Sequence, residues 1–154
     1  MAIVIRPGRP EEAALLSDLA LRSKGFWGYS EQLLDSFRRE LTLSPSDVVD
    51  RRTAVAELNG AVVGFVTVEG PAPTGDLGML FVVPEAIGKG IGAQLFRPAV
   101  ETARSAGFHR LVIESDPNAE PFYRAMGAIR VGGTESGSIP GRELPLLEVD
   151  IVRS

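Results

Sequence analysis

The stretch Phe81-Val-Val-Pro-Glu-Ala-Ile-Gly-Lys-Gly-Ile-Gly-Ala93 decides the fold of this chain. An apolar run typical of a β-strand ends at Pro84, a glycine-rich loop follows, and apolar residues at helical spacing begin at Ile91. The first turn of a helix has backbone N–H groups without internal partners, and the helix dipole adds partial positive charge there. Glycines let the backbone approach a ligand and adopt positive φ. The stretch therefore predicts an anion site, for which phosphate is the usual ligand.

Three kinds of phosphate-binding loop have glycines in such a place. A Walker loop requires Ser or Thr after its lysine, but Gly90 follows Lys89, so this kind is excluded. Gly88, Gly90 and Ala93 literally match the dinucleotide fingerprint G-x-G-x-x-G/A. That fingerprint should directly follow its strand, whereas residues 84–87 intervene here. A nucleotide-dependent oxidoreductase is therefore only a distant alternative.

The third kind is the pyrophosphate loop of acyl-CoA enzymes. Residues 83–92 resemble motif A of the GNAT (GCN5-related) N-acetyltransferase superfamily, Q/R-x-x-G-x-G/A, with Gly90 and Gly92 in the places of its glycines. Ile87 stands where the motif has Gln or Arg. This difference removes one polar side chain but leaves the backbone cradle, so the resemblance still implies acetyl-CoA as the bound acetyl donor.

A second segment, Asp116-Pro-Asn-Ala-Glu-Pro-Phe-Tyr-Arg-Ala-Met-Gly127, resembles motif B of the same superfamily, N-x-x-A-x-x-F/L-Y-x-x-x-G. Phe122, Tyr123 and the final glycine are in register. The first residue is Asp where the motif commonly has Asn, and Asn118 follows two residues later. Two motifs at the family's spacing are more specific than either alone. Together they imply that the residues binding the cofactor are Leu80, Phe81, Val82, Ile87, Gly88, Lys89, Gly90, Ile91, Gly92, Ala93 and Asn118.

Length and composition agree with one globular domain. The 154 residues include 44% hydrophobic and 23% charged ones, and we interpret residues 1–154 as a single GNAT acetyltransferase domain. No cysteine and only one histidine are present, so we expect no disulfide, thiol nucleophile or metal site. The net charge of −4 without a basic block argues against a nucleic-acid partner. Neither a signal peptide nor a membrane span is recognisable, so we expect a cytoplasmic protein.

The remaining chain predicts a mixed fold. The dipeptide Asn59-Gly60 between two β-rich runs indicates a hairpin, which is antiparallel, so a purely parallel sheet is excluded. The expected order is β-α-α-β-β-β-α-β-α-β-β, with residues 77–83 as the strand that leads into the glycine-rich loop. We therefore expect an α/β (α+β) fold with a mixed, mostly antiparallel sheet of about seven strands and about four helices. This order matches the GNAT topology over nearly the whole chain.

The resemblance implies acetyl transfer by direct attack of an acceptor amine on acetyl-CoA, without a covalent enzyme intermediate. A lysine-type amine is charged at neutral pH, and neutralising it takes roughly 4–5 kcal/mol, so a carboxylate that accepts its proton helps. Glu114 is the first candidate for this base, because it lies near the end of the strand before motif B. The other candidates are Glu69, Asp76 and Glu120. Tyr123 matches the family's usual general acid, and its alternative role is that of a core tyrosine.

The segment Phe26-Trp27-Gly28-Tyr29-Ser30 contains the only Trp and one of two Tyr residues. We expect Trp27, Tyr29 and the loop 132–141 to shape the pocket for the acceptor, because loops carry specificity. In the alternative interpretation, the two aromatic residues only fill the hinge between helices. The acceptor is expected to be an amine of a small molecule or peptide. A non-catalytic acyl-CoA-binding or sensor module and a homodimer both stay open as alternatives.

Overall fold

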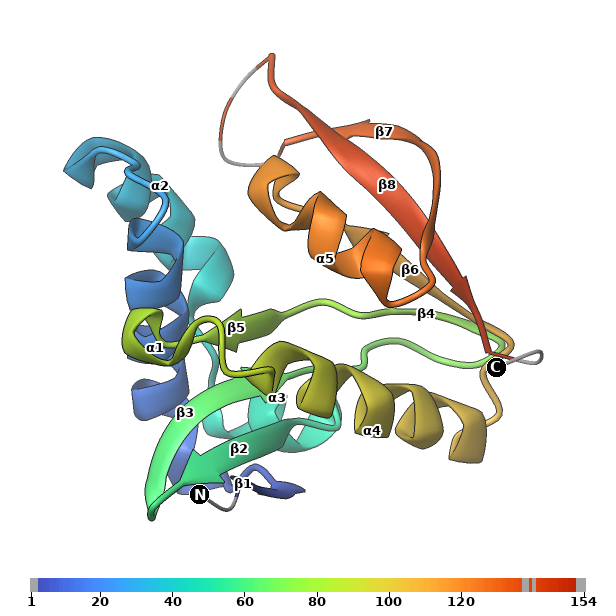
Figure 1. Ribbon diagram of the computed structural model, residues 1–154, viewed down its shortest axis with the longest axis horizontal. Helices are drawn as coiled ribbons and strands as arrows, with labels where there is room; N and C mark the ends of the chain where they lie inside the picture. The colour runs from blue at the N-terminus through green and yellow to red at the C-terminus, as the bar shows by residue number, and fades with distance from the viewer. Residues whose placement is uncertain (1–2, 137–138, 140, 152–154) are drawn as a thin grey trace.

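The computed structural model describes residues 3–136, 139 and 141–151, which form two four-stranded sheets and five α-helices (Figure 1). The strands are β1 (Ile3–Pro7), β2 (Ala54–Leu58), β3 (Ala61–Val66), β4 (Thr74–Asp76), β5 (Leu80–Val82), β6 (Arg110–Glu114), β7 (Ile129–Glu135) and β8 (Glu143–Asp150). The α-helices are α1 (Ala13–Gly25), α2 (Glu31–Leu41), α3 (Pro45–Asp50), α4 (Ile91–Ser105) and α5 (Glu120–Ala125). Short 3-10 turns are η1 (Pro10–Glu12), η2 (Pro84–Ala86) and η3 (Pro117–Ala119).

The two sheets have the strand orders β1-β2-β3-β5 and β4-β6-β8-β7. Neighbouring strands are antiparallel except for the parallel pair β4 and β6. The prediction of a mixed, mostly antiparallel sheet structure with packed helices is thus confirmed. The predicted hairpin between β2 and β3 is also present, and Asn59 and Gly60 at its tip have φ of 53° and 83°. Positive φ at both central residues is the backbone that an Asn-Gly hairpin turn requires.

The strand expected over residues 77–83 is divided between the two sheets. On the β4 side, the Leu77 N–H donates to the Val112 carbonyl at 2.9 Å, which continues the pairing with β6. On the β5 side, the Met79 carbonyl accepts from the Thr67 N–H at 2.9 Å, which continues the pairing with β3. The segment therefore changes partner within a few residues. The two sheets meet at this segment and diverge toward α1 and α2 (Figure 1).

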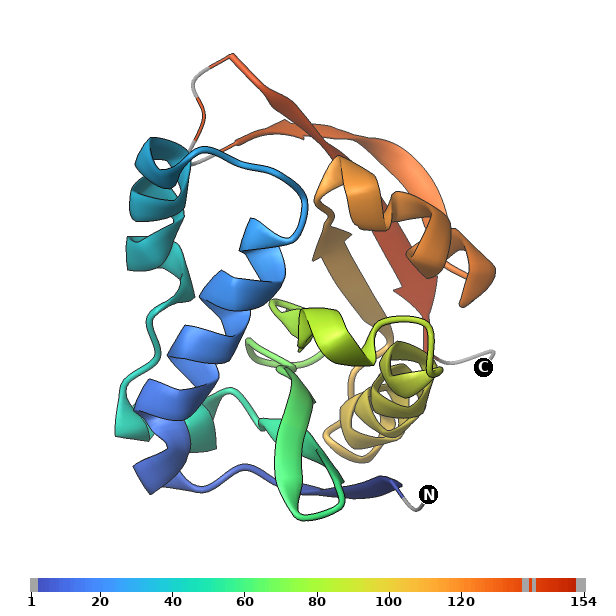
Figure 2. The same ribbon diagram turned by 60° about the vertical axis from the view of Figure 1, so that its left-hand side comes forward.

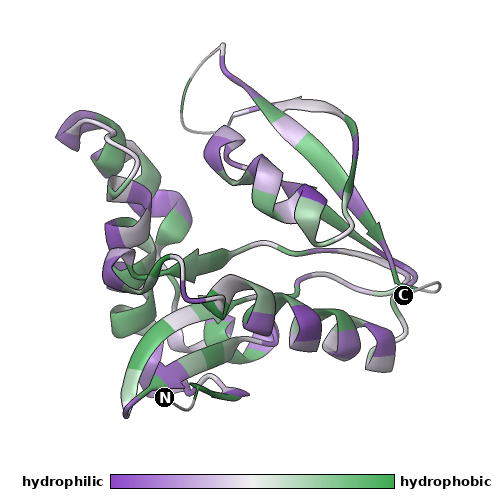
Figure 3. Cartoon of the chain, viewed as in Figure 1, coloured by the Kyte–Doolittle hydropathy of each residue, from purple (hydrophilic) through white to green (hydrophobic). Residues whose placement is uncertain are grey.

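Helices α1 and α4 lie on opposite sides of the first sheet, with the green strands between them in Figure 2. Leu16 of α1, Phe65 of β3 and Leu95 of α4 are completely buried, so the apolar faces of these elements form a continuous core. Figure 3 shows β3 and β5 as mainly hydrophobic, whereas α4 also carries hydrophilic turns. Among the described residues, no helix is long and apolar enough to cross a membrane.

Candidate active site

The glycine-rich loop ends at the first turn of α4. Gly88 and Gly90 have φ of 89° and 76°, and Gly90 is the N-cap of the helix. The helical hydrogen bonds begin where the Gln94 N–H donates to the Gly90 carbonyl at 3.2 Å. The N–H groups of residues 91–93 precede this bond, so they have no partner within the helix. A Cβ at Gly88 or Gly90 would meet no atom within 4 Å, so backbone conformation, not lack of space, favours glycine there.

Strand β5 lies at the edge of its sheet. The Val83 N–H donates to the Val63 carbonyl at 2.8 Å, and the Met79 carbonyl accepts from the neighbouring strand in the same way. Because antiparallel partners alternate along a strand, the intervening Leu80 and Val82 direct their N–H and C=O groups to the opposite edge. Sheet pairing in the described part of the chain leaves this edge open. The edge can therefore pair with an extended ligand that carries amide groups.

A groove of about 510 Å³ runs along the open edge of β5 and the glycine-rich loop. All the predicted cofactor-binding residues line it except Lys89, which is exposed. The loop comes from one side of the groove, and Phe122 and Tyr123 of α5 come from the other. The two sides approach each other closely at Gly92, because a Cβ there would lie 3.1 Å from the Phe122 ring. The predicted residues thus surround one mostly apolar groove with backbone donors at one end.

A second cavity, of about 530 Å³, adjoins the groove and is acidic. Its carboxylates are Glu40, Glu69, Asp76, Glu114, Asp116 and Glu135, and its cationic residues are Lys24 and Arg142. This excess of carboxylates favours a cationic ligand. Six residues line both cavities, and we call them the seam; they are Lys24, Leu80, Phe81, Asp116, Ala119 and Tyr123. A third cavity, of about 470 Å³ between α1 and α2, contains none of the predicted site residues.

Tyr123 is the hydroxyl-bearing residue of the seam, and a phenol can donate a proton. Its side chain is 6% exposed and packs beside Phe122, with ring centroids 5.2 Å apart. Burial, together with the negative charge of Asp116, raises the pKa of the Tyr123 phenol well above its usual value. The phenol therefore stays protonated at neutral pH. None of the described residues forms a hydrogen bond with its hydroxyl. Because Tyr123 lines both cavities, that group is available to a ligand.

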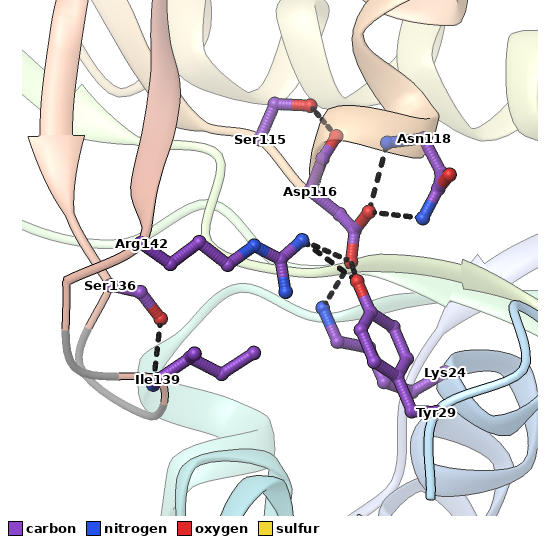
Figure 4. Close-up of polar contacts among 8 residues, drawn as sticks. All are labelled: Lys24, Tyr29, Ser115, Asp116, Asn118, Ser136, Ile139 and Arg142. Atoms are coloured by element: carbon purple, nitrogen blue, oxygen red, sulfur yellow. Dashed lines mark hydrogen bonds and ion pairs between the residues drawn. The ribbon is translucent and has the colours of Figure 1, made fainter. Parts of the chain in front are cut away.

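Asp116 is the centre of a polar cluster between distant parts of the chain (Figure 4). Its Oδ2 accepts from Lys24 Nζ at 2.6 Å and from the Tyr29 hydroxyl at 2.8 Å. Its Oδ1 accepts from the backbone N–H and the side-chain amide of Asn118 at 2.9 and 2.8 Å. Arg142 donates to the Tyr29 hydroxyl at 2.7 Å and lies 3.7 Å from the carboxylate. The cluster thus connects α1, the loop after it, η3 and the loop before β8.

The charge state of Asp116 follows from these contacts. Burial alone raises the pKa of its carboxyl, but the hydrogen bonds from Lys24, Asn118 and Tyr29 outweigh burial and bring the pKa below its usual value. The carboxylate is therefore ionised at neutral pH. The pairing of Lys24 and Arg142 with Asp116 is not predicted from the sequence. The only signal for it was an Asp at the motif position where Asn is common.

The four candidate bases occupy different surroundings. Glu69, Asp76 and Glu114 line the acidic cavity, whereas Glu120 lines neither the cavity nor the groove. Glu120 instead forms ion pairs with Arg124 and Arg130 at 2.8 and 3.5 Å. The structure therefore brings three of the four candidates to one cavity.

Glu69 and Glu114 differ in how firmly they are held. Glu114 is exposed at the end of β6. Glu69 Oε2 accepts from the hydroxyl of Thr67 at 2.7 Å, and this buried hydroxyl accepts from the Met79 N–H at 2.9 Å. The Glu69 carboxylate also lies against Gly78, where any Cβ would clash with it. Glu69 therefore has a fixed orientation, and Glu114 has the freer access to solvent.

The residues expected to shape the acceptor pocket are dispersed. Trp27 lines the groove and not the acidic cavity, and it packs against Phe26 with centroids 5.1 Å apart. Tyr29 lines neither, because its ring packs on Phe37 and its hydroxyl belongs to the Asp116 cluster. Of the predicted loop 132–141, the first four residues belong to β7, and residues 137–138 and 140 lie outside the described part of the chain.

Comparisons with known proteins give a consistent result. The family model of the acetyltransferase (GNAT) family matches residues 16–128. Among solved structures, a GCN5-related N-acetyltransferase from Rhodopseudomonas palustris is similar, with a TM-score of 0.78, 24% identity and coverage of 97% of this chain and 96% of that one. The paiA N-acetyltransferase from Thermoplasma acidophilum, in complex with coenzyme A, gives a TM-score of 0.79, 22% identity and coverage of 97% and 99%.

A GNAT family acetyltransferase from Brucella melitensis, in complex with acetyl-CoA, is also similar, with a TM-score of 0.64 and 22% identity. The similarity covers 97% of this chain and 88% of that one. A search of curated protein sequences gives no match.

Proposed function

The chain belongs to the acetyltransferase (GNAT) family, and we propose that it transfers the acetyl group of acetyl-CoA to a primary amine of a small molecule or peptide, with both substrates bound together. One observation carries the proposal. The groove with the glycine-rich loop and the acidic cavity share a seam that contains Tyr123. An acetyl donor in the groove and an amine in the acidic cavity would meet beside the protonated phenol of Tyr123.

The groove fits acetyl-CoA in two respects. The N–H groups of residues 91–93 and the positive φ of Gly88 and Gly90 provide a cradle for a pyrophosphate. The open edge of β5 provides the N–H and C=O groups of Leu80 and Val82, which suit the amide groups of the pantetheine arm. When bound, acetyl-CoA supplies a thioester whose acetyl group is reactive toward amines. The binding groups belong mainly to the backbone, so Ile87 in place of Gln or Arg leaves most of the site unchanged.

The acidic cavity supports an amine as acceptor. Its carboxylates attract an ammonium group, and one of them must accept a proton, because only the neutral amine attacks. We assign Glu114 as the base that accepts this proton, because it lies in the cavity and has contact with solvent. Glu69 is the second candidate, because Thr67 holds its carboxylate in place. Tyr123 is assigned to donate a proton to the departing thiolate.

The test begins with ligand binding. In a thermal-shift experiment, acetyl-CoA at a hundred times its Kd should add about 2.7 kcal/mol, which is a rise of roughly 5–10 °C for a chain of this length. NADH and ATP at the same concentration serve as controls and should give no comparable rise. A rise with NADH alone would overturn the assignment of the groove.

The second part separates an enzyme from a binding module. A panel of primary amines is assayed by release of CoA thiol, and the Tyr123→Phe variant is compared with the wild type on the best amine. Loss of a general acid should lower kcat about 100-fold. The Kd of acetyl-CoA should not change, because the ring remains. Binding of acetyl-CoA without turnover of any amine would favour a non-catalytic acyl-CoA sensor.

A further inference from the structure

A primary ammonium group of the chain itself lies in the seam. Lys24 is at the end of α1, and its side chain is only 16% exposed. Its Nζ is 2.6 Å from Asp116 Oδ2 (Figure 4). The same Nζ is 4.7 Å from the centre of the Phe37 ring. Lys24 lines both the groove and the acidic cavity. It thus places an amine between the groove proposed for the donor and the cavity proposed for the acceptor.

The surroundings of Lys24 are those of the assigned reaction centre. Tyr123, assigned as the proton donor, lines the same two cavities. The carboxylate that binds Lys24 is close enough to Tyr123 to act on the phenol electrostatically. Glu69 and Glu114, the candidate bases, line the cavity that Lys24 shares. An amine, a base and an acid are therefore gathered at one place without any added acceptor.

The chain has only one other lysine, and its position is different. Lys89 is exposed in the glycine-rich loop and lines neither cavity. We propose that Lys24 is an acetylation site of this protein, modified by the chain's own active site when acetyl-CoA is bound and no external amine is present. The inference rests on the proposed function, because acetyl-CoA is the donor.

The reaction balances without any further reactant. The neutral Nζ of Lys24 attacks the acetyl carbonyl carbon, a C–N bond forms, and the C–S bond of the thioester breaks. Of the two protons that the ammonium loses, one goes to the departing thiolate to give CoA thiol, and the other reaches solvent through a carboxylate of the cavity. Nothing is oxidised or reduced. Lys24 must first leave Asp116, so we expect self-acetylation to be slower than transfer to a good external amine.

Acetylation would alter the site. The amide has no positive charge, so the ion pair with Asp116 is lost, and the longer side chain remains in the seam. We therefore expect the acetylated chain to process external amines more slowly. In this way, acetyl-CoA without acceptor would lower the later activity of the protein.

The experiment uses the full chain incubated with acetyl-CoA and no amine. Tryptic peptides are followed over time by mass spectrometry, in which acetyl-lysine adds one acetyl group and blocks cleavage. We expect acetyl on Lys24, with Lys89 and the α-amino group unmodified over the same period. Because the reaction is intramolecular, the fraction modified per hour should not depend on protein concentration in a dilution series. The Tyr123→Phe variant should label more slowly, and Lys24→Arg should lose the label while keeping a cation beside Asp116.

The controls separate the possible failures. Equal labelling of Lys89, or equal labelling of Lys24 in chain unfolded by urea, would mean simple chemical acetylation and overturn the inference. An unlabelled Lys24 in a preparation that acetylates an added amine would overturn the inference and leave the proposed function standing. Absence of both the label and thermal stabilisation by acetyl-CoA would overturn the proposed function as well.

Discussion

The groove and the acidic cavity meet at the seam, but they are built in different ways. The groove depends largely on one continuous segment, residues 80–93, and on the N–H groups of its backbone. The acidic cavity depends on side chains that come from distant positions, such as Lys24, Glu69, Asp116 and Arg142. A backbone site keeps its binding groups when side chains change, whereas a side-chain site changes its preference with each substitution. Such an arrangement suits an enzyme with one donor and a selective acceptor site.

The largest effect should come from changing the backbone of the groove. Gly90→Val puts a β-branched residue at a φ of 76°, so the loop must move and the cradle of N–H groups is lost. We expect the Kd of acetyl-CoA to rise at least about 100-fold, which is about 2.7 kcal/mol. Isothermal titration calorimetry at a temperature where the variant is folded measures this change.

The matched control is Gly60→Val in the β2–β3 hairpin. Gly60 has a φ of 83°, and a Cβ there also meets no atom within 4 Å, so the backbone strain is comparable. Gly60 lines neither the groove nor the acidic cavity. The Kd of acetyl-CoA for Gly60→Val should therefore equal that of the wild type. Unchanged affinity in folded Gly90→Val would refute the role of the loop in binding.

The next effect should come from breaking the side-chain cluster. Asp116→Asn leaves the Lys24 ammonium without its nearest counter-charge in a largely buried place. We expect the free energy of unfolding to fall by about 2 kcal/mol, because an unpaired buried charge is unfavourable. Urea denaturation followed by circular dichroism measures it.

Asp35→Asn is the matched control for this change. The chemical change is the same, but Asp35 belongs to an exposed ion pair with Arg38 at 3.5 Å. Exposed pairs contribute little, so the stability should remain close to that of the wild type. If both variants behaved alike, the Asp116 cluster would have no special part in stability.

The same contrast explains what could be predicted from sequence. The strand, the positive-φ glycines and the helix start lie within residues 80–93, where local residue preferences decide the backbone. Lys24 is 92 positions from Asp116, and Arg142 is 113 positions from Tyr29, so no local pattern indicates their contacts. The fold could therefore be predicted, together with the residues that surround the groove.

Two further points depended on tertiary packing. An aromatic-rich loop indicates exposed rings, but not which cavity they face, and Trp27 lies at the groove while Tyr29 contacts Phe37 and Asp116. The apolar pattern of residues 77–83 fits a single strand. It does not show that the first part pairs with β6 and the second with β3, because that depends on where the sheets diverge.

A smaller effect should distinguish the carboxylates of the acidic cavity. Glu114→Gln should lower kcat at pH 7 about tenfold, since an exposed carboxylate can be replaced in part by water. The Kd of acetyl-CoA should not change. Glu120→Gln is the control, because Glu120 lies outside both cavities, and its kcat should equal that of the wild type. If Glu69→Gln were the variant that lost activity and Glu114→Gln were not, the base would be Glu69.

The smallest effect should be a difference between the wild type and Asp116→Asn in how the free energy of unfolding depends on acid pH. Asp116 is the only carboxylate among the described residues that line the groove, and its pKa is lower in the folded chain than in the unfolded chain. The folded chain therefore binds fewer protons at this group, so acid favours unfolding. The stabilisation is present above about pH 4, the usual range of an aspartate, and it is lost as the pH falls through the lower pKa of the folded state.

Urea titrations at a series of pH values below 7 test this difference between the wild type and Asp116→Asn. The free energy of unfolding of the wild type should fall more steeply below about pH 4, and the two curves should approach each other in acid. Some acid sensitivity should remain in the variant, because hydrogen bonds from Arg6 also lower the pKa of Glu12. Parallel curves at all pH values would mean that the charge of Asp116 does not stabilise the cluster. In that case the hydrogen bonds of residue 116, without its charge, would hold α1 against η3.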